Sequence, residues 1–371
     1  MNIKQINIWR LKLPFTMPIK HNLANHEFSH NLVVKVTTGD GLSGYGEGIP
    51  RDFVTGETLA GSLAFLNEVL LPAILPLSFE SPQDLLDNLS GVFSQTQAWN
   101  YPAACCALET ALLDAAGKTW DKMLVELLGP QRQEKLFYSA VLPMVPLKKM
   151  AVFLQQVKHH QMKFLKLKVG NGDDLAILQM ARQALGWEID IRVDANGAWE
   201  ATEAIHKIKE MAAYKISAVE QPVAKEDWSG LKKVSEAADV PIIADESICT
   251  LEDAQRLIDL QACQIFNLRL SKCGGLSQAA KIRQKATKAG IQCQLGCHVG
   301  ETSILAAAGR HFALGARNLV FLEGSMAPLY LSQDPVTHSV IFQEKGQAGS
   351  LNGPGLGIQV RERLLDELSI I

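Results

Sequence analysis

The chain has 371 residues, of which 47% are hydrophobic and 20% are charged, and its formal net charge is −3. These values are typical of a globular protein, and the length suffices for two domains or for one barrel with an added domain. Because the net charge is slightly negative and no basic run occurs, we expect no nucleic-acid or polyanion partner.

The start of the chain alternates like a β-strand and lacks the apolar core and cleavage site of a signal peptide. No apolar stretch reaches the length that spans a membrane. The seven cysteines form no paired Cys-x-x-Cys spacing, which favours reduced, buried thiols over zinc ligands or disulfides. We therefore predict a cytoplasmic protein without a membrane partner.

Residues 1–50 are predicted to form β-hairpins, because residues 3–13, 31–37 and 42–48 alternate and Gly39-Asp40-Gly41 marks a turn. Residues 56–128 are predicted to be helical. The segment 104–118 is apolar on most faces, so we expect it to be buried. Leu128-Gly129-Pro130 ends this block.

From about residue 136 the pattern changes to strands that alternate with helices, the latter at 172–185, 202–214, 252–260 and 276–289. This alternation predicts an α/β protein with a closed eight-stranded (β/α) barrel. No helix is predicted after the eighth strand, and the proline- and glycine-rich tail could return to the N-terminal domain. We predict an α+β domain at 1–130, completed by about 340–371, and a barrel at 131–339. The strands should end near Leu142, Lys168, Asp194, Glu220, Asp245, Leu270, Cys297 and Glu323.

Three acidic residues, Asp194, Glu220 and Asp245, stand at the ends of successive strands, about 25 residues or one strand–helix–strand repeat apart. In a parallel barrel their carboxylates converge on one rim and repel one another unless a cation lies among them. Three hard oxygen ligands suit Mg²⁺, with Mn²⁺ as a substitute. If repulsion dominates, neutralising Asp245 should not destabilise the metal-free protein.

Lys166 and Lys168 end the strand that precedes Asp194. Strand alternation places both side chains on one face, towards the barrel mouth. A lysine beside a metal can act as a general base. The alternative is a solvated lysine pair on an edge. It is less favoured because three metal-binding carboxylates end the next three strands.

Several motifs along the chain resemble the enolase superfamily, and within it the muconate-lactonizing-enzyme subgroup. They are Lys166-Leu-Lys168, Asp194-Ala-Asn196, Glu220-Gln221-Pro222, Asp245-Glu246-Ser247, Gly274-Gly275 and the segment 107–118. The resemblance covers essentially the whole chain. It implies an N-terminal α+β capping domain, a modified (β/α)7β barrel, and Mg²⁺ held by the three carboxylates. It also implies removal of the proton α to a substrate carboxylate through an enediolate intermediate.

The chain departs from this pattern at Arg269. The resemblance implies a second catalytic lysine here, at the end of the sixth strand and opposite Lys168. Arginine is never deprotonated in proteins, so Arg269 cannot act as a base, although it can hold or stabilise an anion. Epimerisation by two bases would lack its second base, whereas a cycloisomerisation or a syn β-elimination needs only one. The alternative is a structural ion pair on the rim.

His298 lies beside the position of a catalytic histidine in the related mandelate-racemase arrangement, but Arg269 stands where that histidine's aspartate partner is expected. His298 is therefore a catalytic candidate or a packed rim residue. Glu301 and Glu323 close the last two strands. Dipeptide epimerases of the subgroup grip a substrate ammonium with an Asp-x-Asp signature, of which this chain keeps only Glu323. Asn196, His298, Glu301 and Glu323 are candidate substrate-binding residues.

The resemblance further implies that two capping-domain loops, here 15–30 and 47–57, select the substrate. Candidate contacts are His21, Arg51 and Thr55, and the sequence Thr55-Gly-Glu-Thr58 resembles a loop of several dipeptide epimerases. Histidines 21, 26 and 30 could form a zinc site, but scattered polar contacts of a lid are favoured. Lys20 and Arg51 could bind a second anionic group.

The sequence thus predicts a Mg²⁺-dependent isomerase or lyase acting on a small carboxylate and most like a muconate-type cycloisomerase. Lys168 would be the acid/base, Lys166 an electrostatic helper and Arg269 the opposing cation. The alternatives are a dipeptide epimerase or N-acylamino-acid racemase, and an enolase-like scaffold that binds a ligand without turnover. We also expect an even-numbered homo-oligomer.

Overall fold

The N-terminal part of the protein is a three-stranded antiparallel sheet with helices packed against it. The computed structural model describes residues 1–21 and 24–370. Strands β1 (Ile3–His21), β2 (Ala24–Thr38) and β3 (Ser43–Gly48) lie in the order β1-β2-β3. The first two strands are longer than the alternating runs predicted from the sequence, because pairing continues beyond a register shift between Pro14 and Ile19.

The N-terminal helices follow in chain order and centre on a buried helix, α5. Their bounds are α1 (Asp52–Thr55), α2 (Leu59–Phe65), the π-helical η1 (Leu66–Leu70), α3 (Leu71–Ile74), α4 (Pro82–Gln95), the 3₁₀ turn η2 (Ala98–Asn100), α5 (Pro102–Thr119) and α6 (Leu124–Leu128). Residues 102–117 of α5 are buried, which agrees with the prediction. Strand β3 can approach α5 closely because it carries glycines: a Cβ at Gly46 would lie 2.0 Å from the carbonyl oxygen of Ala107.

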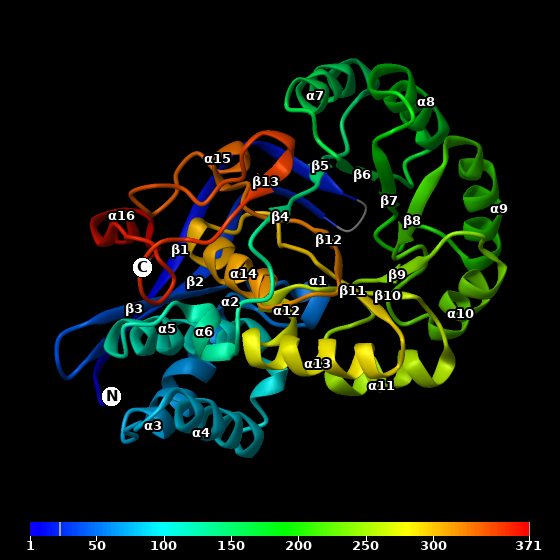
Figure 1. Ribbon diagram of the computed structural model, residues 1–371. Coiled ribbons are helices and arrows are strands. Elements are labelled where there is room, and N and C mark those ends of the chain that lie inside the picture. Colours follow the sequence, from blue (N-terminus) through cyan, green and yellow to red (C-terminus); the bar gives the residue numbers. More distant parts are fainter. Residues whose placement is uncertain (22–23, 371) are drawn as a thin grey trace.

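The barrel is a parallel sheet of eight strands in the order β12-β11-β10-β9-β8-β7-β6-β5, and Figure 1 shows these strands inside a ring of helices. The backbone N–H of Ser139 donates to the carbonyl of Leu322 at 2.8 Å and so joins the two edges. The strands are β5 (Ala140–Leu142), β6 (Phe164–Lys168), β7 (Asp190–Asp194), β8 (Ile216–Glu220), β9 (Ile242–Ala244), β10 (Ile265–Leu268), β11 (Gln292–Leu295) and β12 (Leu319–Leu322).

The helices of the barrel cover its outside. They are α7 (Leu147–His159), α8 (Asp174–Leu185), α9 (Ala201–Met211), the 3₁₀ turn η3 (Ala212–Tyr214), α10 (Trp228–Ala237), α11 (Leu251–Leu260), the short α12 (Leu270–Cys273), α13 (Leu276–Lys288) and α14 (Ser303–Leu314). The predicted fold class, a modified barrel with an α+β domain before it, is confirmed. After β12 the chain forms only the four-residue helix α15 (Ala327–Tyr330), so the eighth unit lacks a full helix, as the sequence indicated.

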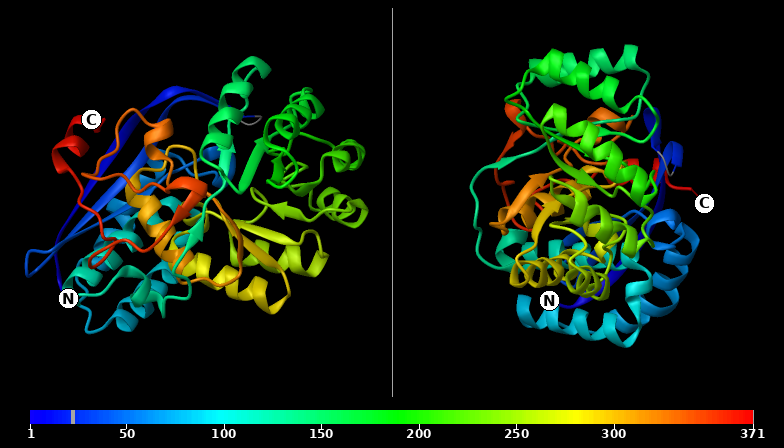
Figure 2. Two further views of the ribbon diagram at one scale, coloured as in Figure 1. Left: turned by 45° about the horizontal axis from the view of Figure 1, so that its top comes forward. Right: turned by 90° about the vertical axis from the view of Figure 1, so that its right-hand side faces the viewer.

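The C-terminal segment runs back over both parts of the molecule. It includes the 3₁₀ turn η4 (Glu344–Gly346), β13 (Gln347–Ala348), which pairs with β4 (Leu136–Phe137), and α16 (Glu362–Leu368). Figure 2 shows α16 beside the N-terminal sheet. There the indole of Trp9 donates to Asp366 at 2.8 Å, and Lys35 pairs with Glu362 at 2.7 Å.

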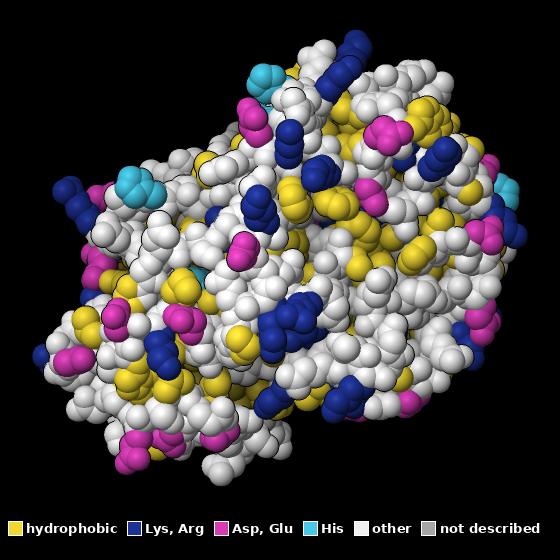
Figure 3. Space-filling model, in the orientation of Figure 1, with side chains coloured by type: hydrophobic (Ala, Val, Ile, Leu, Met, Phe, Trp, Pro, Cys, Tyr) yellow, Lys and Arg dark blue, Asp and Glu magenta, His cyan; other side chains and the backbone are white. Residues whose placement is uncertain are grey.

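The β1–β2 ribbon crosses from the N-terminal sheet to the mouth of the barrel (Figure 2). A bridge between Phe15 and Leu331 fixes its path. On the face seen in Figure 3, acidic and basic side chains are interspersed. Within the part of the chain that the structure describes, no helix is both long and apolar enough to cross a membrane.

Candidate active site

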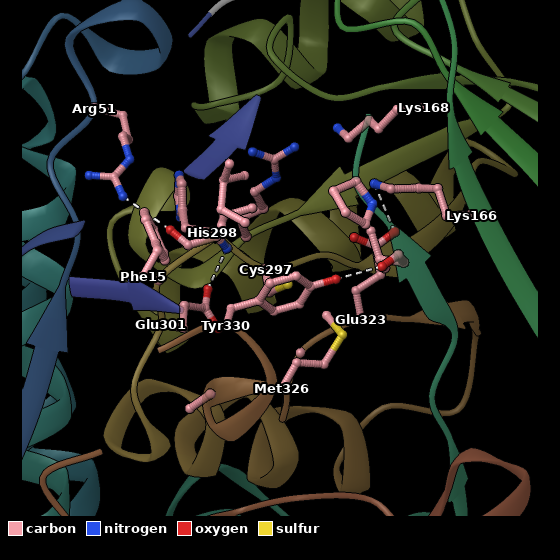
Figure 4. Close-up of a pocket in the computed structure, with 18 of the residues that line it drawn as sticks. Phe15, Arg51, Lys166, Lys168, Cys297, His298, Glu301, Glu323, Met326 and Tyr330 are labelled. Atoms are coloured by element: carbon pink, nitrogen blue, oxygen red, sulfur yellow. Dashed lines mark hydrogen bonds and ion pairs between the residues drawn. The ribbon is translucent and has the colours of Figure 1, made fainter. Parts of the chain in front are cut away.

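A cavity of about 90 Å³ lies where the carboxyl ends of the barrel strands meet the β1–β2 ribbon and the α1 segment. Active sites of (β/α) barrels occur at this end because the strand-to-helix loops are free to vary there. Its wall combines apolar groups with charged ones (Figure 4). The lining includes Phe15, Ile19, Arg51, Phe53, Val54, Leu142, Lys166, Lys168, Asn196, Glu246, Arg269, His298, Glu301, Glu323, Met326 and Tyr330.

The three predicted metal ligands are buried side by side at the strand ends. Asp194 pairs in register with Lys168 of β6 and with Glu220 of β8, and Asp245 directly follows β9. All three side chains have 0% exposure. Parallel pairing thus brings together carboxylates that are far apart in the sequence.

Lysine, arginine and amide side chains of the protein contact these three carboxylates. Asp194 accepts Lys168 at 2.7 Å and lies 3.2 Å from Lys166. Burial alone would raise the pKa of Asp194, but the ammonium groups of these two lysines hold that pKa well below its usual range. Asp245 pairs with Lys272 at 2.8 Å and with Arg269. Glu220 accepts hydrogen bonds from Lys166, Asn267 and Gln294 at 2.8–3.0 Å.

The donor set fits Mg²⁺ in chemistry and in charge. Among the residues described, no group of three acidic, histidine or cysteine side chains is arranged to hold a metal ion, because the carboxylates contact lysine and arginine instead. Lys166, Lys168 and Arg269 also line the cavity, and of these Lys168 and Arg269 are the more exposed, at 13% and 10%. A dication on Asp194, Glu220 and Asp245 would replace two positive charges, and both side chains would then be free to face a substrate.

Lys166 and Lys168 share one face of β6, as strand alternation predicted, and Figure 4 shows both at the same side of the cavity. Lys166 is only 2% exposed and pairs with Asp194, Glu220 and Glu323 at 2.9–3.2 Å. Burial would lower the pKa of Lys166, but these carboxylates raise it above its usual value, so Lys166 is a fixed positive charge.

Lys168 is more accessible, at 13% exposure, and contacts Asp194 and the side-chain oxygen of Asn196, the latter at 2.6 Å. Asn196 has a left-handed backbone with φ of 44°, and its N–H donates to Asp194 at 3.0 Å. Its amide also donates to Glu246 at 3.1 Å. Asn196 therefore orients the lysine and two carboxyl groups at once.

Arg269 lines the same cavity from the opposite part of the sheet, since β10 is four strands from β6. Its Nη2 contacts Asp245, and its Nε is buried without a hydrogen-bond partner. Glu246, which follows Asp245, has a buried Oε2 that also lacks a partner. Burial raises the pKa of Glu246, and the charge of Asp194 adds to this effect.

Glu323 is the counter-ion of two buried cations. It lies 2.9 Å from Lys166 and 2.5 Å from Arg192, which is fully buried on β7 and also donates to Ser139 at 2.9 Å. Burial opposes ionisation, but Lys166 and Arg192 lower the pKa of Glu323 to about 2. The carboxylate of Glu323, which could have bound a substrate ammonium, is therefore already paired with two cations of the protein.

His298 and Glu301 form a turn beside the cavity after β11. The backbone N–H of His298 donates to Glu301 at 2.7 Å, and the Nδ1 of His298 is buried without a partner. Burial lowers the pKa of His298 well below its usual value, and the charges of Arg269 and Arg51 act in the same direction. Burial raises the pKa of Glu301 to about 8. Both groups are therefore neutral at pH 7.

The candidate residues of the capping domain are only partly brought together. Arg51 lines the cavity. Thr55 lies at the end of α1, donates to the carbonyl of Arg51 at 3.2 Å and lines a neighbouring pocket instead. The side chain of His21 lies outside the described part of the chain. The segment predicted as a loop at 15–30 is mostly the β1–β2 ribbon.

Sequence reasoning assigned no role to Lys272 or Arg192, although both contact the charged cluster. A signal existed for each of them. Arg192 stands two residues before Asp194 and so lies on the same strand face, and Lys272 stands two residues before the Gly274-Gly275 motif. Phe15, Phe53 and Tyr330 were missed because single aromatic residues on separate elements give no signal of a shared cavity.

Comparison with known proteins gives two family matches that cover most of the chain. Residues 5–129 match the mandelate racemase/muconate lactonizing enzyme N-terminal domain, and residues 149–364 match the enolase C-terminal domain-like family. A hydrophobic dipeptide epimerase of Enterococcus faecalis is 34% identical over 96% of this chain and 99% of the relative. An N-succinyl-L-Arg/Lys racemase of Bacillus cereus is 28% identical over 100% and 98%, respectively.

Solved structures of the same kinds of enzyme superpose on the whole chain. The B. cereus racemase has a TM-score of 0.92 at 27% identity and covers 100% of this chain and 99% of its own. The E. faecalis epimerase with Mg and L-Leu-L-Tyr has a TM-score of 0.87 at 32% identity, covering 97% and 100%. A muconate lactonizing enzyme from Pseudomonas fluorescens with muconolactone has a TM-score of 0.91 at 25% identity, covering 100% and 99%.

Proposed function

The chain belongs to the mandelate racemase/muconate lactonizing enzyme family of the enolase superfamily and is an enzyme, and from this premise we propose that it moves the proton α to a substrate carboxylate with the help of Mg²⁺. The observation that carries this proposal is the shared cavity of Lys168 and Arg269, which project from strands four apart beside buried carboxylates. A substrate between them would meet a base on one side and a permanent cation on the other.

Asp194, Glu220 and Asp245 would hold the metal, with Mn²⁺ as a substitute. When bound, Mg²⁺ would supply positive charge next to the substrate carboxylate, which makes the α-proton more acidic. Lys168 would take up and return the proton at its Nζ. Asn196 fixes the position of that amine, and the ion pairs of Lys166 keep a positive charge behind it.

The reaction that these residues support best uses one base, as in a muconate-type cycloisomerisation or a syn β-elimination. Arg269 cannot deliver and remove a proton at pH 7, but it can balance the negative charge of an intermediate. Its buried Nε, without a partner among the described residues, is a donor available to a substrate.

A second candidate is epimerisation or racemisation of an amino-acid derivative, and His298 favours it. Its Nδ1 is buried beside the cavity without a partner, so a neutral imidazole could act on the second face of the α-carbon. The named relatives, which are epimerases and racemases, support the same candidate.

Proton exchange in D₂O tests the proposal and separates the two candidates. We expect Lys168→Ala to abolish exchange of the α-proton. Arg269→Met should slow turnover by roughly two to four orders of magnitude, the scale of a lost anion-stabilising group, without abolishing exchange. Arg269→Lys should open the second face and give measurable epimerisation.

Mass spectrometry of the products with chiral separation is the measurement. Efficient inversion by the wild-type enzyme, with deuterium in both enantiomers, would contradict the one-base reading. Loss of that inversion in a His298→Asn variant would then identify the second base.

Three further statements belong to the same proposal. The proposed domain division is 1–130 with about 340–371, and 131–339; the hydrogen bond from Trp9 on β1 to Asp366 on α16 supports it. The seven described cysteines are free, which supports a reducing compartment such as the cytoplasm. Assembly into an even-numbered homo-oligomer remains a prediction that sedimentation tests.

A further inference from the structure

Arg51 is a cation of the cavity that makes no close ion pair with a described carboxylate, although Asp52 is its neighbour in the chain. Arg51 donates through Nη1 to the carbonyl of Pro50 and through Nη2 to Ser29 and to the carbonyl of Val299, at 3.0–3.2 Å. None of these acceptors is charged. Within the described residues, Arg51 forms no ion pair within 4.0 Å. Burial lowers the pKa of Arg51 to about 10, and the charge of Arg269 adds to this effect, yet the guanidinium stays charged at pH 7.

Most acidic groups of the cavity are not available to a positively charged ligand. Glu323 is shared by Lys166 and Arg192. Glu301 is neutral at pH 7 because burial raises its pKa to about 8. Glu246 accepts the amide of Asn196 and faces Arg269 at 4.0 Å. For a substrate ammonium this leaves the Oε2 of Glu246, which has no hydrogen-bond partner among the described residues but belongs to the carboxyl group that already faces Arg269. An ammonium group would therefore be poorly balanced in this cavity, which is unfavourable.

Arg51 and the lysines of β6 lie on opposite sides of the cavity in Figure 4, with Arg51 at the capping-domain side. The lining of the cavity also contains apolar side chains. It includes Phe15, Ile19, Phe53, Val54, Leu142, Met326 and Leu331. The cavity therefore offers cations on two opposite sides and apolar side chains in the same lining.

We propose that the substrate is a small dicarboxylate, whose reacting carboxylate lies between Lys168 and Arg269 and whose second carboxylate binds Arg51, and that substrates with a free ammonium group are rejected. This inference rests on the proposed function for the reacting end only. A diacid of this kind is either an amino acid acylated by a dicarboxylic acid or an unsaturated dicarboxylic acid. Arg51 is a specificity-determining residue because a bidentate guanidinium–carboxylate contact is strong and directional.

The test compares three leucine derivatives that share the reacting end. N-succinyl-leucine carries a second carboxylate, N-acetyl-leucine carries no second charge, and glycyl-leucine carries an ammonium. Deuterium exchange at the leucine α-carbon is measured on the Mg²⁺-loaded enzyme, together with consumption of cis,cis-muconate as the unsaturated diacid. We expect one of the two diacids to react. If it is N-succinyl-leucine, its kcat/KM should exceed that of N-acetyl-leucine by roughly ten- to a hundredfold, the size of a charge-assisted contact, and that of glycyl-leucine by more.

Arg51→Met should reduce this preference to about one, chiefly by raising KM for the diacid, and Arg51→Lys should restore part of it. Arg363→Met, which removes an arginine that is 92% exposed on α16, is the matched control and should leave the preference unchanged. The inference would be overturned if the α-proton of glycyl-leucine exchanged as fast as that of N-succinyl-leucine. It would also be overturned if Arg51→Met left the preference for the diacid unchanged.

Calorimetric binding of N-succinyl-leucine, cis,cis-muconate and N-acetyl-leucine separates this inference from the proposed function. Absence of turnover with all compounds, together with tighter diacid binding that Arg51→Met abolishes, would reject the proposed chemistry and keep the dicarboxylate site. Equal binding of the diacids and of N-acetyl-leucine would reject the dicarboxylate site, whatever the turnover.

Discussion

Asp245 is held by two cations that come from one short stretch of chain, Arg269 and Lys272. Lys272 is fully buried, and its ammonium also donates to the carbonyl oxygens of Asp245 and Asn267 at 2.5 and 2.9 Å. Burial lowers the pKa of Lys272. The carboxylate of Asp245 therefore balances a charge that has no access to water.

This geometry reverses the expectation that neutralising Asp245 would leave the metal-free protein no less stable. Removing one partner of a buried ion pair leaves the other charge uncompensated, which costs about 3–5 kcal/mol. We predict that Asp245→Asn lowers the free energy of unfolding by an amount of this size in EDTA, besides weakening Mg²⁺ binding and abolishing turnover.

Urea unfolding in EDTA and calorimetric titration with Mg²⁺ are the measurements. Asp259→Asn, at an exposed aspartate of α11 that contacts only Gln255, is the matched control. An Asp245→Asn protein as stable as wild type in EDTA would show that repulsion among the carboxylates outweighs their ion pairs.

The sequence could predict which carboxylates meet, because their positions at strand ends follow from the repeat of the barrel. It could not predict how they are balanced. The pairing of Glu323 with Lys166 and Arg192 depends on three strands, β12, β6 and β7, whose side chains meet only inside the closed barrel. The same holds for Thr55, whose place in the neighbouring pocket depends on the turn of α1.

At the scale of elements, two buried carboxylates of the capping domain accept hydrogen bonds from the N-termini of barrel helices. Glu47 on β3 accepts the N–H groups of Thr302 and Leu305 at 3.0 Å, and the hydroxyl of Thr302 at 2.6 Å, where α14 begins. Glu109 on α5 accepts the N–H of Ser277 at the start of α13. Positive helix N-termini favour a carboxylate there, so these contacts fix the two domains to each other.

Burial nevertheless raises the pKa of Glu47 from 4.5 to about 7. Between these two pH values the folded protein binds more protons at this site than the unfolded chain, so this group makes stability fall as pH rises from about 4.5 to about 7, after which its contribution is constant. We predict that Glu47→Gln removes this part of the pH dependence, which amounts to on the order of 3 kcal/mol.

The check is urea unfolding of wild type and Glu47→Gln at several pH values between 4.5 and 8. The difference in unfolding free energy between the two proteins should change over this range and level off above about pH 7. A constant difference would mean that Glu47 keeps the pKa of an exposed glutamate. Glu252→Gln, at an exposed glutamate of α11, serves as the control.

A single lysine of the barrel holds the α1 segment over the cavity. Lys225 donates to the carbonyls of Phe53 and Val54 at 3.3 and 3.1 Å, and both of these residues line the cavity. We predict that Lys225→Met loosens this segment and speeds amide exchange at residues 54–56 by roughly ten- to a hundredfold, since hydrogen bonds to charged groups contribute about 1.5–3 kcal/mol.

Hydrogen exchange followed by mass spectrometry reports this directly, without a substrate. Lys232→Met is the matched control, because Lys232 lies on the next helix, α10, and pairs with Glu236 at 3.7 Å. Unchanged exchange at 54–56 in Lys225→Met would show that other contacts hold α1 in place.

The elements themselves were predictable because each had a periodic pattern. The barrel strands end within two residues of the predicted positions, from Leu142 to Glu323. The resemblance implies a loop at 15–30, where Pro18 and several histidines and asparagines interrupt the alternation. The pairing of the β1–β2 ribbon resumes at Ile19 after the register shift, a tertiary effect that local propensity does not report.

For the whole molecule, the C-terminal segment ties the sheet of the capping domain to the barrel. The N–H of Leu356 donates to Asp114 on α5 at 2.8 Å, the N–H of Leu124 donates to the carbonyl of Gly355 at 2.8 Å, and α16 covers β1. Leu356 and Leu365 have 0% exposure. A chain that closes its first domain with its last residues should unfold as one cooperative unit.

We predict that Leu365→Ala lowers the free energy of unfolding by about 2–5 kcal/mol, the cost of an apolar cavity in a core, and that it does so in a single transition. Loss of packing under α16 should act on the barrel as well, because β13 in the same segment pairs with β4 at the entry to the barrel. Fluorescence and circular dichroism recorded during urea unfolding should therefore coincide in wild type and in the variant. Leu329→Ala, at a leucine that is 64% exposed, should change stability by less than about 0.5 kcal/mol. Two separate transitions in Leu365→Ala would show that the capping domain unfolds independently and that residues 340–371 do not complete it.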